Sequence, residues 1–199
     1  MKLSGIHPLP VSFYDRPVLE VARDLLGKVF VRKLGGQLLA GKIVETEAYH
    51  ETGDPSCHAH RGKTKRNEVM FGPPGHLYVY FTYGMHYCMN VVAEKEGTAA
   101  AVLVRALEPL EGLDIMQKNR GEKFRVKDYC NGPAKLCQAL GITTEQNGSS
   151  LLSGGIIIAD GQTISDSDTA VATRIGISQG KEHPWRFYIR GNGFVSKQG

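Results

Sequence analysis

The chain has 199 residues, of which 41% are hydrophobic and 22% charged, and its formal net charge at pH 7 is +4. This composition is typical of a soluble globular protein, and the length predicts one domain over residues 1–199. No apolar run approaches the roughly 18 residues of a membrane span, and the mildly basic balance is compatible with a nucleic-acid partner without demonstrating one.

The first predicted elements are a helix and a β-hairpin. Asp15 can cap the helix, Pro17 suits its first turn and Gly27 follows its end. The apolar residues between Pro17 and Gly27 recur on one face at helical spacing, so we expect the helix to cover a sheet. Two strands follow, Lys28–Leu34 and Gln37–Tyr49, and the pair of glycines between them is a strong hairpin signal.

The middle of the chain is predicted to be a long loop followed by three strands. Residues 50–70 show little periodicity and many polar side chains, and a loop of this length in a compact domain is often functional. The strands His76–Thr82, His86–Ala93 and Ala99–Leu107 come next, separated by short turns. Consecutive strands with short connections are expected to pair antiparallel, as a meander.

The rest of the chain alternates between helical and strand patterns. Helical pieces are expected around Leu110–Lys118 and Gly132–Leu140, and strands at Gly155–Ala159, Ala170–Ile177 and Arg186–Arg190. No repeat, low-complexity segment or linker divides the chain. The order of these elements predicts an α+β fold around a mainly antiparallel sheet.

Two carboxylates and one arginine form the first candidate site. Glu45 and Glu47 lie two residues apart on a predicted strand, so their side chains point to the same face. On a solvated face the pair would have no role, but burying two like charges is costly unless each is paired. Arg105 ends an apolar strand as an isolated cation, and a buried arginine needs a carboxylate. Glu47 and Arg105 could therefore hold a water molecule, with Glu47 as the general base.

Several tyrosines occur on the strands that carry this candidate site or follow it in the chain. Tyr49 lies two residues beyond Glu47 and points the same way, while Tyr78 and Tyr80 share one face of a later strand. Most such rings fill a core or pack across neighbouring strands. The functional interpretation is a slot in which a nucleic-acid base stacks.

The turn between two of the meander strands carries bulky side chains. Turn tips are normally polar, whereas Tyr83 and Met85 would be held in water on a projecting hairpin. Proteins that bend DNA insert such side chains between base steps. The alternative is that the turn folds back onto the protein.

Histidines and basic residues recur in the long loop. His58 and His60 could offer metal ligands, but no third ligand occurs at a supporting spacing, so we expect no metal site. The basic residues that either contact phosphates or form a solvated face are Arg61, Lys63, Lys65, Arg66 and Lys135. Lys135 stands near the start of a predicted helix, where free backbone amides also favour an anion.

Eight motifs in the right order match one known family. They are Ile43–Tyr49, Leu77–Tyr80, Tyr83–Met85, Cys88–Asn90, Val104–Gly112, Gly132–Leu140, Thr173–Gly176 and Arg186–Gly191. On these motifs nearly the whole chain resembles the alkyladenine DNA glycosylases, the 3-methyladenine DNA glycosylases of the mammalian type that bacteria also contain. The resemblance implies a curved, mainly antiparallel sheet flanked by helices, with a protruding β-hairpin.

The resemblance also implies an activity. The family removes damaged purines, alkylated or deaminated, by hydrolysing the N-glycosidic bond, with no metal and no cofactor. The target nucleotide is flipped out of the duplex, as enzymes acting on a base require. The expected partner is therefore damaged double-stranded DNA, bound by a monomer. Because residues 1–5 lack an apolar signal core, we expect a cytoplasmic protein at the bacterial nucleoid, or a nuclear one in a eukaryote.

Roles carry over from the family by position. Glu47 activates the water, which Arg105 and the backbone carbonyl of Ile175 hold. The pocket residues are Tyr49, His58, Tyr80 and Asn90, and the intercalating residues are Tyr83 and Met85. Asn90 rejects guanine by crowding its exocyclic amine, and Tyr83 fills the gap that the flipped nucleotide leaves.

Two assignments and two other functions remain to be weighed. His58 rather than His60 is placed in the pocket by its spacing from Tyr49, and Glu45 is left with a structural or solvated role. A non-catalytic module that binds damaged or structured nucleic acid would keep the exposed turn and the basic loop without needing Glu47. A nucleoside hydrolase would use the same pocket, but a small substrate leaves no gap for the turn to fill.

Overall fold

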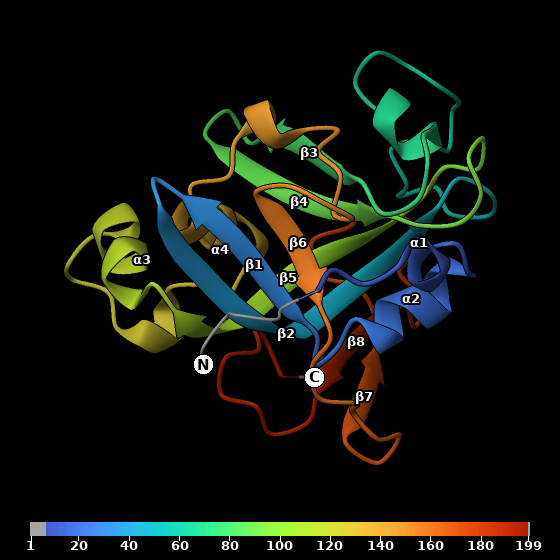
Figure 1. Cartoon of the computed structure of the whole chain (residues 1–199). Helices are drawn as coiled ribbons and strands as arrows, with labels where there is room; N and C mark the ends of the chain where they lie inside the picture. The colour runs from blue at the N-terminus through green and yellow to red at the C-terminus, as the bar shows by residue number, and fades with distance from the viewer. Residues whose placement is uncertain (1–6, 199) are drawn as a thin grey trace.

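The computed structural model describes residues 7–198, so the N-terminal segment considered for a signal lies outside the described residues. Within this range, eight strands form one sheet in the order β3-β4-β5-β2-β1-β6, with β8 pairing β2 and β7 pairing β8 (Figure 1). The strands are β1 (Val29–Leu34), β2 (Gln37–His50), β3 (Leu77–Thr82), β4 (His86–Val92), β5 (Ala100–Glu111), β6 (Ile156–Ala159), β7 (Thr169–Ala172) and β8 (Arg186–Ile189). All strand pairings are antiparallel, as predicted.

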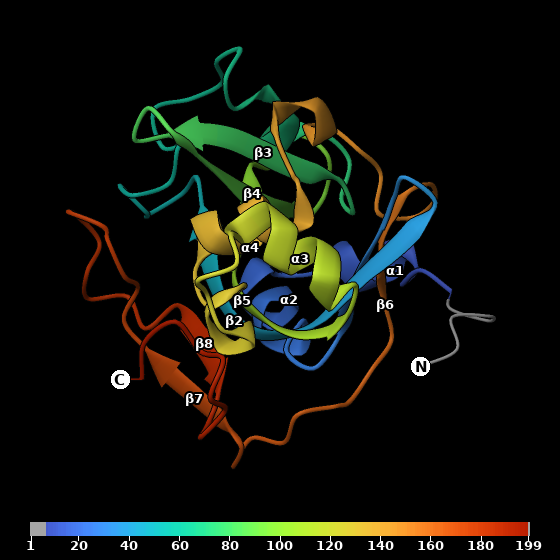
Figure 2. The ribbon, with the colours of Figure 1, turned by 90° about the vertical axis from the view of Figure 1, so that its left-hand side faces the viewer.

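Short helices accompany the sheet. They are α1 (Val11–Tyr14), α2 (Val18–Asp24), α3 (Leu113–Arg120) and α4 (Pro133–Leu140), with single 3-10 turns η1 (Glu68–Phe71), η2 (Val126–Asp128) and η3 (Thr144–Gln146). Figure 2 shows α3 and α4 side by side, with the sheet curling around the helices. The largest buried cluster joins α2 and α4 to β2, β4 and β5. None of the helices in residues 7–198 is long and apolar enough to cross a membrane.

The first predicted helix exists, but its cap was wrong. The structure has a separate turn, α1, that ends at Asp15, so this carboxylate does not cap α2. Helix α2 begins after Pro17, and the free backbone N–H of Val18 donates instead to the carboxylate of Glu94 at 2.9 Å. The free N–H group at the start of α2 is therefore bound by the distant Glu94, and not by the neighbouring Asp15 as predicted.

Strand β2 is the central element of the sheet. It pairs with β5 along most of its length and with β1 and then β8 on its other edge. The register with β5 shifts around Glu45, as at a β-bulge. Because β2 continues to pair as far as Ala40, β5 extends to Glu111, beyond its predicted end at Leu107. Residues 45–47 therefore lie in the interior of the sheet.

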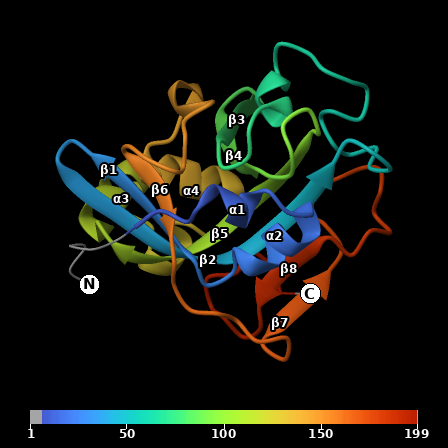
Figure 3. The ribbon, with the colours of Figure 1, turned by 45° about the vertical axis from the view of Figure 1, so that its right-hand side comes forward.

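Two long segments meet beside the C-terminal end of β2. The predicted loop after Tyr49 is largely irregular, with η1 near its end. The predicted strand Ala170–Ile177 ends at Ala172, so residues 173–185 form a second irregular segment that returns to β8. Figure 3 shows the two segments side by side at the edge of the molecule, where Ser56 Oγ donates to the carbonyl of Gln179 at 2.6 Å.

Candidate active site

The Glu47 carboxylate is fully buried and held by three groups. Its Oε1 accepts a hydrogen bond from the backbone N–H of Ile175 at 2.7 Å, and its Oε2 accepts one from the Tyr49 hydroxyl at 2.9 Å. Oε2 also lies 3.2 Å from Nη1 of Arg105. Burial raises the pKa of Glu47, and these partners oppose the rise only in part. A carboxylate whose pKa is raised by burial binds a proton more tightly than a surface carboxylate does.

Arg105 binds both carboxylates of β2. Its Nε lies 3.0 Å from Oε1 of Glu45, which also receives Nη1 of Arg186 at 3.1 Å. The second oxygen of Glu45 accepts the backbone N–H of Ser196 at 2.7 Å. Burial lowers the pKa of Arg105, but Glu47 and Glu45 outweigh it and raise the pKa overall. Glu45 is thus a buried structural anion, and the solvated alternative was wrong.

The strand register explains why these charges are interior. Glu47 lies opposite Leu103 of β5 on one side and Arg186 of β8 on the other. Because paired strands lie on both edges of β2 here, Glu47 is in the interior of the sheet and not at its edge. Two carboxylates and two arginines there compensate one another, which offsets much of the cost of burying each charge.

A cavity of about 490 Å³ adjoins this group through Arg105, which lines it, whereas Glu47 lies behind its lining residues Tyr49, Arg105 and Ile175. This volume is in the range typical of small-molecule sites. The predicted site residues that line it are Tyr49, His58, Tyr80, Tyr83, Asn90, Arg105 and Ile175. The sequence did not indicate Met70, Cys88, Leu103 or Pro133, which line it as well. Elements from both halves of the chain therefore build a single pocket.

Aromatic rings form one wall of the cavity. The rings of His58 and Tyr80 meet edge to face with centroids 4.5 Å apart, and those of Tyr78 and Tyr80 lie 5.5 Å apart. His58 Nδ1 lies 3.0 Å from the Tyr78 hydroxyl. Burial, aided by the charge of Arg66, lowers the pKa of His58, and burial raises the pKa of Tyr78 to about 12. The wall is therefore made of neutral rings at pH 7.

The two histidines of the long loop have different positions. Both side chains are partly open to solvent, but only His58 lines the cavity, while Nδ1 of His60 lies 3.3 Å from the carbonyl of Glu51. Asn90 is buried on β4, and its side-chain amide donates to the carbonyl of Tyr78 at 3.1 Å. The Asn90 amide is thus held in one orientation at the cavity surface.

The β3–β4 turn projects into solvent. Tyr83 is 82% exposed and Met85 is 70% exposed. Tyr83 and Gly84 both have positive φ, 52° and 67°, as hairpin turns of type I′ require. A non-glycine residue with positive φ is uncommon. The turn geometry imposes this conformation on Tyr83, which places its side chain at the tip of the hairpin. The turn does not fold back onto the protein.

None of the predicted basic residues lines the cavity, and of these only Arg66 has a contact with one of its lining residues. The exposed ones in the long loop are Arg61, Lys63, Lys65 and Arg66. Arg66 lies over the ring of Tyr80 at 5.6 Å and donates to the carbonyl of Phe81 at 3.5 Å, which ties the loop to β3. Lys135 is exposed on α4, where its ammonium group contacts Asn131 at 2.9 Å. Lys135 does not line the cavity, although its neighbour Pro133 does.

The sequence model of the methylpurine-DNA glycosylase (MPG) family matches residues 12–193. The chain belongs to this family. A Carboxydothermus hydrogenoformans protein named "Putative 3-methyladenine DNA glycosylase" is 58% identical over 191 residues, covering 96% of this chain and 99% of that protein. Proteins of the same name from Chlorobaculum parvum and Methanocella arvoryzae are 51% and 48% identical, covering 94% and 96% of the chain and 90% and 96% of their own lengths.

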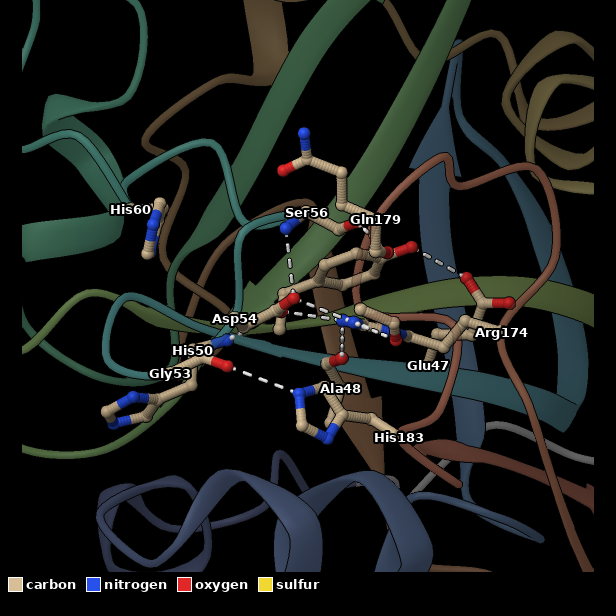
Figure 4. Close-up of polar contacts among 12 residues, drawn as sticks. Glu47, Ala48, His50, Gly53, Asp54, Ser56, His60, Arg174, Gln179 and His183 are labelled. Carbon is tan, nitrogen blue, oxygen red and sulfur yellow. Dashed lines mark hydrogen bonds and ion pairs between the residues drawn. The ribbon is translucent and has the colours of Figure 1, made fainter.

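The sequence reasoning missed a second buried ion pair in this methylpurine-DNA glycosylase family member. Figure 4 shows the guanidinium of Arg174 between Asp54 and the carbonyl of Ala48. Neither side chain of the pair has any exposed surface. One signal was present, because Arg174 interrupts an apolar strand pattern with a charge as Arg105 does. The partner Asp54 comes from an irregular loop, where no periodicity marks a buried position.

Proposed function

We propose that this protein excises alkylated or deaminated purines from double-stranded DNA, acting as a monomer that flips the damaged nucleotide into the cavity. Membership of the methylpurine-DNA glycosylase family makes it a hydrolase of N-glycosidic bonds and makes DNA its partner. The contacts of Glu47 are the observation that carries the proposed mechanism.

Glu47 is proposed as the general base that activates water. Its carboxylate is buried, has a raised pKa and keeps a cation and two donors around it. Cleavage of the N-glycosidic bond builds positive charge on the sugar, which an adjacent carboxylate stabilises electrostatically. The same carboxylate accepts a proton as the water attacks.

The water is proposed to bind between Arg105 and the carbonyl of Ile175. Arg105 lines the cavity while its guanidinium is fixed by two carboxylates. Ile175 is anchored by its own N–H to Glu47 and also lines the cavity. Anchoring both water ligands to the base reduces the entropy lost when the reacting groups come together.

The aromatic wall is proposed to hold the flipped base. Tyr49, His58 and Tyr80 line a cavity of purine-compatible size, and electron-rich rings stack favourably on a cationic alkylated purine. Asn90, fixed by its bond to Tyr78, would crowd the exocyclic amine of guanine. Exclusion by a misfit group gives selectivity without new attractive contacts.

The hairpin tip and the basic loop are proposed to hold the duplex. Tyr83 enters the space that the flipped nucleotide leaves, with Met85 beside it, as apolar wedges do in other DNA-bending proteins. The loop residues Arg61, Lys63, Lys65 and Arg66, together with Lys135, contact phosphates, which position the protein without reading sequence.

The test is base release from duplexes carrying one alkylated adenine, hypoxanthine or ethenoadenine. Glu47→Gln should reduce release at least about a hundredfold, the lower range of general-base contributions, while binding to damaged duplex persists. Glu96→Gln, an exposed carboxylate elsewhere, is the control. Substantial turnover by Glu47→Gln contradicts the proposed mechanism. Binding of damaged duplex by the wild-type protein without cleavage would favour the binding module, and release from free inosine as fast as from DNA would favour the nucleoside hydrolase.

A further inference from the structure

Arg174 and Asp54 form a bidentate ion pair beside the Glu47 site. Nη1 of Arg174 lies 2.6 Å from Oδ2 of Asp54, and Nη2 lies 2.7 Å from Oδ1. Both side chains are fully buried. Parallel, charge-assisted bonds of this kind are strong and fix the relative orientation of the two groups. The pair therefore joins the loop after β2 to the segment after β7 in one geometry.

The same guanidinium binds two backbone carbonyls. Nη1 donates to Ala48 on β2 at 3.0 Å, and Nη2 donates to Gly180 at 3.3 Å. Gly180 has a φ of +59°, and a Cβ there would lie 3.0 Å from Nη2 of Arg174. A side chain at position 180 would therefore crowd the arginine. Arg174 connects β2 with both irregular segments that line the cavity.

Arg174 also touches the supports of the proposed base. Its guanidinium carbon lies 4.6 Å from the ring centroid of Tyr49, whose hydroxyl binds Glu47. The next residue, Ile175, supplies the backbone N–H that binds Glu47. On another side, the guanidinium lies 5.1 Å from the ring centroid of Trp185. Of the three groups that hold Glu47, two therefore belong to direct neighbours of Arg174: the Tyr49 hydroxyl and the Ile175 N–H.

We propose that the Arg174–Asp54 pair is a positioning clamp for the reaction, which fixes the Tyr49 hydroxyl and the Ile175 amide against Glu47. The proposal rests on the proposed role of Glu47 as the base. Arg174 does not line the cavity, so it is a positioning residue that acts through its neighbours.

The hydrogen bonds to Glu47 predict an effect on the pH profile of activity, which a general loss of stability would not produce. Glu47 is surrounded by several titratable groups: Glu45 and Tyr49 on β2, Cys88 on β4, Arg105 on β5 and Arg174. Arg186 on β8 pairs with the neighbouring Glu45. Losing the clamp loosens two hydrogen bonds that stabilise the ionised form of Glu47. Its pKa, already raised by burial, should rise further, and the acid limb of the activity profile should move to higher pH.

The experiment compares Arg174→Lys, Asp54→Asn and the double variant Arg174→Gln/Asp54→Asn with the wild-type protein. Lysine keeps the positive charge but lacks the planar fork that makes the bidentate contacts. We expect base release to slow by roughly a hundredfold, as for small misplacements of catalytic groups, with KM nearly unchanged and the acid limb shifted upward in all three variants. Arg125→Lys, which changes an exposed arginine on the surface, should match wild type.

A direct titration separates this proposal from the proposed function. The carboxyl carbon of Glu47 can be followed by NMR against pH in the free protein, with no DNA present. A wild-type protein that releases no base would overturn the function, while the titration would still test the clamp. Arg174→Lys with the wild-type rate and the wild-type Glu47 titration would overturn the clamp. If single variants fold poorly, the double variant, which leaves no unpaired buried charge, decides by the same two measurements.

Discussion

The backbone N–H of Ile175 donates a 2.7 Å hydrogen bond to Oε1 of Glu47, across 128 positions of the sequence. The contact joins a central strand to an irregular segment that comes after β7. It also brings a residue with no polar side chain into a polar site through its backbone. The carboxylate proposed as the base is consequently positioned by the fold as a whole, and changes distant in the sequence are expected to affect it.

The acid side of the activity profile should report Glu47. The base must be ionised, and burial raises its pKa, so ionisation is lost at a higher pH than for an exposed glutamate. We expect kcat/KM for base release to fall as pH decreases, with the midpoint above about 4.3, the pKa of an exposed glutamate. A midpoint at or below that value, in wild-type protein that stays folded, would contradict the assignment of Glu47.

Tyr83→Ala should impair flipping more than chemistry. The side chain is 82% exposed and makes little contribution to folding. Stacking on a base contributes about 1–3 kcal/mol, so release from fully paired duplex should slow by roughly tenfold or more. Release of the same base from an unpaired bulge should change little. Leu110→Ala, another exposed apolar residue, is the control, and equal losses on both substrates would remove the wedge role.

Arg105→Met should destabilise the fold as well as abolish activity. The substitution leaves Glu45 with one arginine and Glu47 with none, deep in the sheet. Breaking a buried ion pair in this way typically costs about 3–5 kcal/mol. Urea unfolding curves monitored by Trp185 fluorescence would measure the loss. A variant as stable as wild type would mean that Arg105 serves the reaction alone.

Asn90→Ser should relax discrimination against guanine. The shorter side chain gives up the crowding of the exocyclic amine, and one misfitting group typically changes selectivity by about 10- to 200-fold. The measurement is the ratio of release rates for guanine and hypoxanthine at the same duplex position. Hypoxanthine lacks the amine and serves as the internal reference. An unchanged ratio would assign the selectivity to other residues of the pocket.

Lys63→Ala and Lys65→Ala should weaken binding to all duplexes alike. Each phosphate contact contributes about 0.9 to the slope of log affinity against log salt. Fluorescence anisotropy at several salt concentrations should show that slope reduced by about one for each lysine that contacts a phosphate. Lys118→Ala, on the exposed surface of α3, is the matched control. A uniform slope across all three variants would remove the loop from the interface.

Local pattern was sufficient for the type and order of most elements of the fold, but not for all of their ends, and for the polar residues of the central strands. Alternation and turn glycines predicted the hairpin and the meander, because they reflect conformational preferences that act over a few residues. Glu47 and Arg105 could be paired in advance, since a charge inside an apolar strand requires a compensating partner. Resemblance to the family supplied the proposed roles of Ile175 and Asn90, which the residue types alone do not indicate.

Only the tertiary structure decided which distant groups complete the site. The contact of Glu94 with the start of α2, the binding of Glu45 by Arg186, and the clamp between Asp54 and Arg174 all join segments far apart in the chain. Such partners leave no periodic trace, because hydrogen bonds and ion pairs in loops depend on the path of the backbone in space. The sequence determined that a buried carboxylate would need support, and the packing of two irregular segments against β2 determined where that support comes from.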